Sequence, residues 1–199
     1  LLAANDAISL ADWEVAPETT QSTCRALAAV AANEGERLPS RLVAIQGLSD
    51  APVACAPNRK PTELLASSEP EIRRATVLAL LPNSAPASTS ALLVAAQDRN
   101  GGVAAAAGAR LCERRAKSPA LPVDPPLLPL PPLPTQPPLR KLVLSEGALP
   151  EDVMAMLPCL AASADPADRK ALEELQSGGS VTVREAIRRL QEKAASPSH

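Results

Sequence analysis

The hydrophobic and polar positions of the chain follow the spacing of amphipathic helices. In residues 18–33, Cys24, Leu27, Val30 and Ala31 recur every three or four residues and would share one helix face. The chain contains 39 alanines and 29 leucines. Such small and medium aliphatic side chains suit closely spaced helices and not a sheet rich in aromatic and β-branched residues. We therefore expect an all-α fold.

Signals for helix starts agree with this prediction. Proline, which fits the first turn of a helix, precedes the helices predicted over residues 62–66 and 88–97 and also opens residues 165–176. Two sequences have the pattern of a capping box, Ser68-Glu69-Pro70-Glu71 and Thr182-Val183-Arg184-Glu185. These segments are short and regularly spaced, which indicates a series of helix pairs.

One window recurs along the chain. Residues 72–80 align with residues 40–48 at an offset of 32 and with residues 103–111 at an offset of 31, and residues 183–190 repeat the pattern with one residue fewer. Each window has small residues in its middle and ends in leucine. A fixed period in the range of 20 to 50 residues is typical of repeat architectures.

The clearest window resembles the second helix of the short HEAT-like repeats of bacteria, in which an acidic or proline turn precedes an aliphatic residue, Arg, two small residues and a final Leu. It reads Pro70-Glu71-Ile72-Arg73-Arg74-Ala75-Thr76-Val77-Leu78-Ala79-Leu80. The resemblance covers roughly half of the chain and implies an α-solenoid used for binding or scaffolding. Some relatives act on bilin pigments, but no residues that would carry that reaction are found here. Gly101-Gly102 replaces the acidic turn and Ala104 replaces Arg73, so the polar ladder expected from that Arg would be incomplete.

The resulting fold prediction is a short HEAT-like α-solenoid of stacked helix pairs with a polyproline-rich strap and a C-terminal helical segment. Its expected parts are HEAT-like repeats over residues 1–117, the strap over residues 118–139 and a repeat-like helical segment over residues 140–199. An Ala-rich helical bundle is the alternative, because small residues also recur by chance in such bundles.

The strap has ten prolines in 22 residues, so we expect polyproline II, in which every third residue shares a face. Five leucines share that register, Leu121, Leu127, Leu130, Leu133 and Leu139. An exposed leucine stripe is an aggregation hazard. We therefore expect these leucines to dock on a helical surface, preferably that of the chain itself, otherwise a groove on a partner. A ligand for an SH3-type module is a weaker alternative.

The four cysteines, at positions 24, 55, 112 and 159, lie outside any CxxC motif and have no histidine nearby. This pattern argues against a zinc site and favours two disulfides, with Cys24–Cys55 and Cys112–Cys159 preferred among the three pairings. Disulfides would place the chain in the periplasm or outside the cell. The alternative is that Cys24 and Cys112 are small buried hydrophobic side chains, in a cytoplasmic protein.

The composition lacks side chains that most catalytic sites use. The chain has no Phe or Tyr, its only tryptophan is Trp13 and its only histidine is His199. His-based triads and His metal sites therefore lose their usual residue, and we expect no catalytic residues, no metal and no cofactor. Trp13 is expected either to cap the first repeat or to anchor a partner. A net charge of -2 and the lack of aromatic stacking surfaces argue against nucleic acid, and no stretch is apolar enough to span a membrane.

These observations predict a non-catalytic scaffold or accessory subunit that binds other proteins within a larger, exported assembly. The alternative is a regulatory or substrate-presenting domain of a larger enzyme, and a catalytic role of an unusual kind is the least favoured. Fold-level analogy alone supports the scaffold, since solenoids serve many purposes. The partner, the stoichiometry and the binding face are not specified by the sequence.

Overall fold

The computed structural model describes residues 17–50, 55, 61–80, 86–117 and 137–195. Over these residues the regular structure is entirely α-helical, as the apolar spacing predicts. The helices are α1 (Pro17–Ala32), α2 (Leu38–Asp50), α3 (Pro61–Leu65), α4 (Pro70–Ala79), α5 (Pro86–Ala95), α6 (Gly101–Lys117), α7 (Leu139–Val143), α8 (Pro150–Ala161), α9 (Pro166–Gly178) and α10 (Val181–Ala195).

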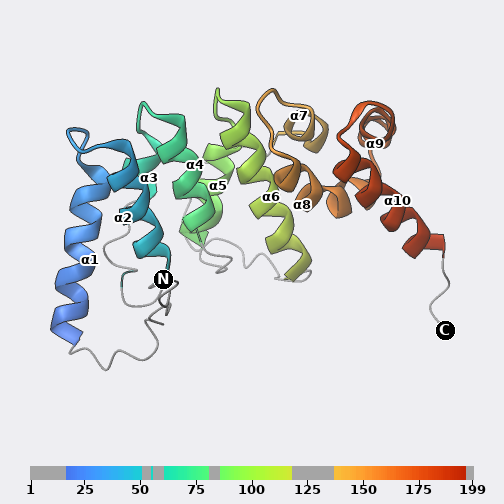
Figure 1. Cartoon of the computed structure of the whole chain (residues 1–199). Coiled ribbons are helices and arrows are strands. Elements are labelled where there is room, and N and C mark those ends of the chain that lie inside the picture. The colour runs from blue at the N-terminus through green and yellow to red at the C-terminus, as the bar shows by residue number, and fades with distance from the viewer. Residues whose placement is uncertain (1–16, 51–54, 56–60, 81–85, 118–136, 196–199) are drawn as a thin grey trace, which may run out of the picture.

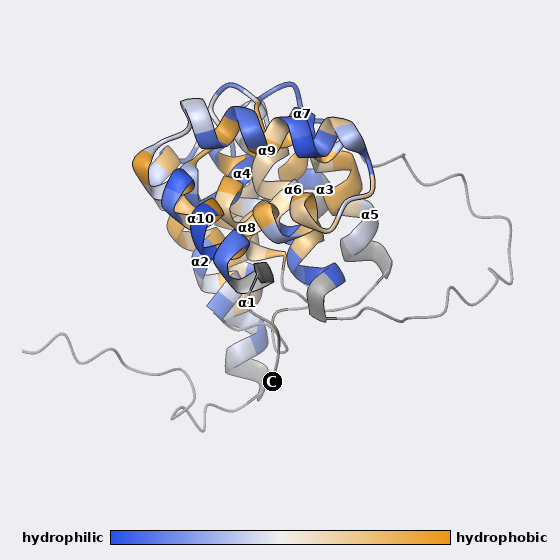
Figure 2. Ribbon diagram, turned by 90° about the vertical axis from the view of Figure 1, so that its right-hand side faces the viewer, coloured by the Kyte–Doolittle hydropathy of each residue, from blue (hydrophilic) through white to orange (hydrophobic). Residues whose placement is uncertain are grey.

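The helices lie in one elongated row that runs from α1 to α10 (Figure 1). The even-numbered helices pack in chain order, α2 on α4, α4 on α6, α6 on α8 and α8 on α10. Each odd-numbered helix packs on the even-numbered helix that follows it. Seen from the α10 end, hydrophobic residues concentrate between the helices, and hydrophilic residues prevail on the outer sides of α7 and α10 (Figure 2).

The pattern of burial repeats along the even-numbered helices. Residues 41–48 on α2 and 73–80 on α4 follow nearly the same order of buried, half-buried and exposed positions, and 153–160 on α8 match those of α4. On α6 the residues whose burial best matches that of 73–80 are 105–112, which lie 32 residues later. The sequence alignment of Leu111 with Leu80 predicts an offset of 31 instead. The buried position that holds leucine in α2, α4 and α8 is therefore occupied by Cys112 in α6.

Three groups of buried residues follow one another along the row, and α6 belongs to two of them. Its Val103, Ala106 and Ala107 pack with α4 and α5, and its Ala105 and Cys112 pack with α7 to α10. Helices that precede residues 118–136 in the chain and helices that follow them therefore both pack on α6.

The alanines and one glycine of α6 explain why this helix can be covered on both sides. Residues 102–109 are all buried, and most of them are alanine. At Gly108 an added Cβ would lie 2.6 Å from Leu142 Cδ1 and 2.8 Å from Met156 Sδ. Small side chains thus let α7 and α8 approach α6 on one face while α4 and α5 cover the other.

The first two residues of α6 are also glycines because another loop lies against them. A Cβ on Gly101 would overlap the carbonyl oxygen of Glu146, and one on Gly102 would lie 2.8 Å from the carbonyl oxygen of Gly147. Ser145 Oγ donates to the carbonyl of Gly101 at 3.1 Å. Gly147 itself has φ of 81°, a left-handed conformation that favours glycine. The Gly101-Gly102 pair therefore serves a long-range contact as well as a local turn.

Neither predicted capping box forms. The N-cap of α4 is Glu69, which makes no side-chain cap bond, because Ser68 lies one residue too early to cap the helix. Ser67 Oγ instead accepts a hydrogen bond from the Glu69 amide at 3.3 Å. α10 begins at Val181, before Thr182, and Ser180 Oγ accepts from the Val183 amide at 3.3 Å. The two helices are where the sequence predicts them, but Ser180 bonds the first turn of α10 and Ser67 bonds the N-cap amide of α4.

Candidate functional site

The structure brings the four cysteines together in the two preferred pairs. Cys24 on α1 is joined to Cys55, which follows α2, with 5.1 Å between their Cα atoms. Cys112 on α6 is joined to Cys159 on α8, with 6.0 Å between their Cα atoms. The two bonds close segments of 31 and 47 residues. Each bond therefore ties elements that are distant in sequence and adjacent in the row.

Arg41 and Arg73 take equivalent places on α2 and α4, and their exposed fractions are only 2% and 5%. Arg41 Nε donates to the carbonyl oxygen of Ala31 at the end of α1 at 3.0 Å. Its Nη2 lies 3.5 Å from Ser67 Oγ, before α4. Arg41 thus links the first helix pair to the turn before α4.

Arg73 makes the stronger set of these bonds. Its Nε and Nη2 donate to the two carboxylate oxygens of Asp98 at 2.7 and 2.9 Å, and its Nη1 donates to the carbonyls of Ser67 and Ser68 at 2.9 and 3.0 Å. Burial would raise the pKa of Asp98, but the hydrogen bonds from Arg73 and from the Asn100 amide outweigh it, and the pKa is lowered. Asp98 is thus held as a carboxylate at the turn before α6.

Arg74 extends this network to a third helix. Its Nη1 lies 2.8 Å from Asp152 Oδ2 on α8 and 3.4 Å from the carbonyl oxygen of Gly102 on α6. Burial raises the pKa of Asp152 above its ordinary value and outweighs the opposing effect of Arg74. Together with Arg73, Arg74 connects α4 to the elements on both sides of α6.

A face suited to contact with other molecules runs along the exposed side of the even-numbered helices, here called the even-helix face. On α2 it carries Val43, whose exposed fraction is 70%. On α4 it carries Leu78 at 39%. In the recurring burial pattern, Val43 on α2 corresponds to Ala75 on α4. Ala75 lies three residues before Leu78 and therefore shares a helix face with it, so Val43 and Leu78 belong to the same face. Pro158 is the equivalent of Leu78 on α8 and is also exposed.

At its C-terminal end the even-helix face is hollowed between α8 and α10. The groove has a volume of about 410 Å³. It is lined by Met154, Thr182, Glu185, Ala186, Arg189 and Leu190. Apolar side chains thus share this groove with one acidic and one basic group.

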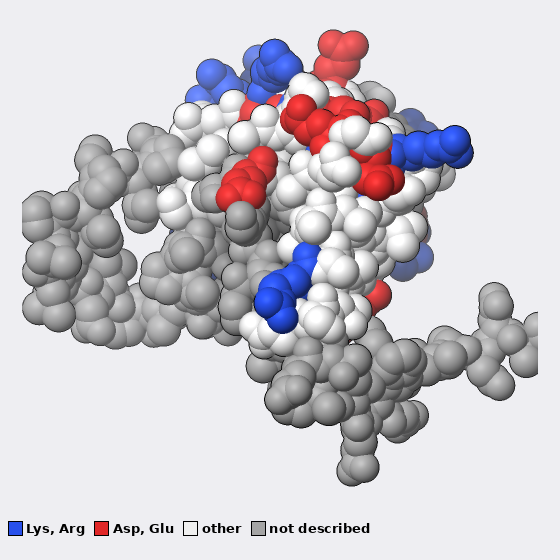
Figure 3. Space-filling model, turned by 90° about the vertical axis from the view of Figure 1, so that its left-hand side faces the viewer, with Lys and Arg blue, Asp and Glu red and all other residues white. Residues whose placement is uncertain are grey.

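Charges on the even-numbered helices occur largely as neighbouring pairs. Arg110 and Glu113 on α6 are 2.7 Å apart, and Glu185 on α10 lies 2.8 Å from Arg188 and 3.1 Å from Arg189. On the end of the row formed by α1, basic side chains lie in separate groups, with acidic ones between them (Figure 3). The face shown there presents mixed charge and no continuous basic patch.

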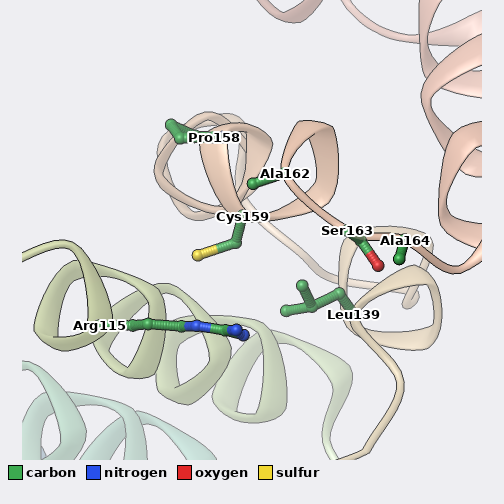
Figure 4. A pocket seen from close by; sticks show the side chains of 7 residues that line it. All are labelled: Arg115, Leu139, Pro158, Cys159, Ala162, Ser163 and Ala164. Carbon is green, nitrogen blue, oxygen red and sulfur yellow. The ribbon is translucent and has the colours of Figure 1, made fainter. Parts of the chain in front are cut away.

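A second hollow, of about 420 Å³, opens where α6, α7 and α8 meet. Arg115, Leu139, Pro158, Cys159, Ala162, Ser163 and Ala164 line it (Figure 4). The Cys159 sulfur points toward α6, and the Arg115 side chain extends along α6 toward Leu139 (Figure 4). One sulfur of the Cys112–Cys159 disulfide therefore faces this space.

Most of the residues expected to dock lie outside the described residues, namely Leu121, Leu127, Leu130 and Leu133, and so does Trp13. Leu139 is described, and the polyproline expectation for it is wrong. It is the first residue of α7, after the N-cap Pro138, and it packs on the buried residues shared by α6 to α10. A helical start is possible there because the last proline precedes position 139.

The described residues hold no group of three or more His, Cys, Asp or Glu side chains placed to bind a metal ion. Among the helices of the described part, none is long and apolar enough to cross a membrane.

The acidic partner of Arg73 was not predicted from the sequence. Asp98 is 25 residues away, in a turn, so no helical spacing connects the two. A local signal was present in Asp98-Arg99-Asn100, since Asp98 Oδ1 accepts from the Asn100 amide at 2.8 Å and Asn100 Oδ1 accepts from the Val103 amide at 3.1 Å. Such Asx turns before a helix are a recognisable motif.

These features were compared with known proteins. No protein-family model, no curated protein and no solved structure matches this chain.

Proposed function

We propose that the chain is a short HEAT-like α-solenoid that acts as a non-catalytic scaffold or accessory subunit and binds partner proteins through the even-helix face. The solenoid is supported by the order in which α2, α4, α6, α8 and α10 pack and by the burial pattern that recurs along them. A repeat of this kind buries its apolar side only against its neighbours, which agrees with the way α6 serves two hydrophobic groups.

The observation that carries the binding role is the exposure of apolar side chains on equivalent faces of successive helices. Val43 and Leu78 are exposed, although the fold buries many other aliphatic side chains. The groove beside Met154 continues the same face on α8 and α10. Apolar surface on rigid helices, edged by charged groups, is suited to an amphipathic helix of a partner.

An oxidising compartment, either the periplasm or the extracellular space, is part of the proposal. It is supported by the two disulfide pairs, because disulfides persist where thiols are not kept reduced. Protein isolated from its source and alkylated before and after reduction should gain four labels only after reduction. Four labels before reduction would place the chain in a reducing compartment.

The binding role is tested by cross-linking and co-purification from the native source. The wild-type chain should bring down a partner in a fixed ratio. The double variant Val43→Glu/Leu78→Glu should lose that partner, because two charges would be buried in the contact. Val94→Glu is the matched control, since Val94 is 55% exposed but lies on the odd-numbered helix α5, outside the even-helix face.

Equal loss of the partner in the control variant, or unchanged recovery in the double variant, would remove the even-helix face from the proposal. Each variant is first shown to have the wild-type melting temperature. Recovery of the native protein as part of a longer polypeptide with enzyme activity would favour the alternative, a regulatory or substrate-presenting domain.

A further inference from the structure

The two disulfides differ in how far a reactant can reach them. Cys24 and Cys55 each have an exposed fraction of 1%, so both sulfurs of that bond are enclosed. In the other bond, Cys112 is 4% exposed, but Cys159 is half-buried and lines the hollow between α6, α7 and α8. Access in thiol–disulfide exchange decides which sulfur is attacked. Of the four cysteines, Cys159 is the one that is half-buried rather than buried and that lines this hollow.

The hollow also carries a charge. Of its lining residues, Arg115 alone bears one, and Arg115 is exposed at the end of α6. Behind the lining residue Ser163, Arg140 on α7 lies 2.8 Å from Asp165, the N-cap of α9, and 4.0 Å from Asp168, which accepts a hydrogen bond from Ser163, so these three charges offset one another in part. The other lining residues are apolar or carry a hydroxyl, as Figure 4 shows. The space therefore favours a small molecule with an apolar portion and a negative charge.

We propose that this hollow is a binding site for small anionic thiols and that Cys112–Cys159 is a bond that such thiols open by attack on Cys159. The incoming thiolate forms a bond to the Cys159 sulfur, and the bond between Cys159 and Cys112 breaks. Cys112 leaves as a thiolate and takes a proton from water. A second thiol then attacks the mixed disulfide and releases Cys159, so that two thiols are oxidised to one small disulfide while the protein gains two thiols.

The consequence for the fold is local. Reduction removes the covalent link between α6 and α8, whereas Cys24–Cys55 continues to tie α1 to the segment after α2. The contact between α6 and α8 then depends on non-covalent interactions, among them the packing around Gly108 and the bonds of Arg74 to Gly102 and Asp152. The hollow shares Pro158 with the even-helix face, but thiol exchange at Cys159 does not require the partner-binding role proposed above.

The test compares three small thiols on the full oxidised chain, the anionic 2-mercaptoethanesulfonate, the neutral 2-mercaptoethanol and the cationic cysteamine. Each rate is divided by the rate of the same thiol with a neutral small disulfide, which removes the differences in thiol acidity. Reaction is stopped by alkylation, and peptide mass spectrometry locates the modified cysteine. We expect the first mixed disulfide on Cys159 and a rate order of anionic, neutral and then cationic.

The charge preference should be about two- to fivefold per step, as an exposed ion pair supports, and Arg115→Gln should abolish it. Arg115→Lys should retain it, and Arg25→Gln, at an exposed arginine of α1, should leave it unchanged. The proposal fails if Cys24–Cys55 opens as fast as Cys112–Cys159, if the adduct is found on Cys112, or if Arg115→Gln keeps the wild-type order. Resistance of Cys112–Cys159 to all three thiols would also overturn it.

Discussion

Replacing Arg73 by methionine tests whether the buried network between α4 and the turn before α6 stabilises the fold. Methionine keeps most of the aliphatic stem, so packing against neighbours changes little. The four hydrogen bonds of the guanidinium to Asp98, Ser67 and Ser68 are lost together. The side chains of Arg73 and Asp98 are only 6% and 11% exposed, so water cannot fully replace these bonds.

The expected cost is large because a charge is left buried without its partner. Breaking a buried ion pair by removing one member costs about 3–5 kcal/mol. For a chain of this size, that loss corresponds to a fall in melting temperature of about 6–20 °C. In the double variant Arg73→Met/Asp98→Asn the uncompensated charge is gone, and about 1–2 kcal/mol of the loss should be recovered.

The measurement is urea unfolding at pH 7, followed by far-ultraviolet circular dichroism, with both disulfides oxidised. Arg25→Met is the matched control because Arg25 is exposed on α1, and its effect should stay within about 0.5 kcal/mol. A loss below about 1 kcal/mol for Arg73→Met would refute the reasoning, since a removed buried partner costs more than that. So would a double variant that is less stable than the single one.

Gly108→Ala should lower the free energy of unfolding by about 1–3 kcal/mol through overpacking, whereas Gly178→Ala, where an added Cβ meets nothing within 4 Å, should raise it by about 0.5–1 kcal/mol in the same urea titration. The pKa of Asp98 is lowered from its ordinary value of 3.8. The ionised carboxylate therefore stabilises the fold fully above that pH, and this stabilisation is lost as pH falls through the folded-state pKa. Asp98→Asn should accordingly flatten the acid side of a stability–pH curve. Replacing Cys24 and Cys55 by alanine should cost about 3.5–4 kcal/mol by the chain-entropy relation, visible as a lower melting temperature in calorimetry.

Much of the helical layout could be predicted because its signals are local. Apolar spacing and first-turn prolines located α1, α3, α5 and α9 to within about two residues. The cysteine pairs were also accessible to sequence reasoning, because each joins elements that neighbouring windows place side by side. What the leucine alignment missed was the register of α6, since Cys112 holds the buried position that leucine holds elsewhere.

The polar contacts could not be predicted because they depend on positions that only folding brings together. Arg74 and Asp152 are 78 residues apart, and nothing in either local sequence indicates the other. The reason for glycine at positions 101 and 102 is likewise the loop that contains Gly147, which belongs to the far side of the proline-rich segment. The exposure of Val43 and Leu78 could not be predicted either, because helical spacing shows which face of a helix is apolar but not whether another helix covers that face.

The position of α6, with one hydrophobic group on each side and a sulfur link to α8, has a practical consequence for proteolysis. A single peptide-bond cleavage between α6 and α7 would yield two fragments that still interlock through this helix. The nicked protein would migrate as one species in electrophoresis without reductant and as two bands with it. A chain cut at this point would therefore still be held together as one molecule.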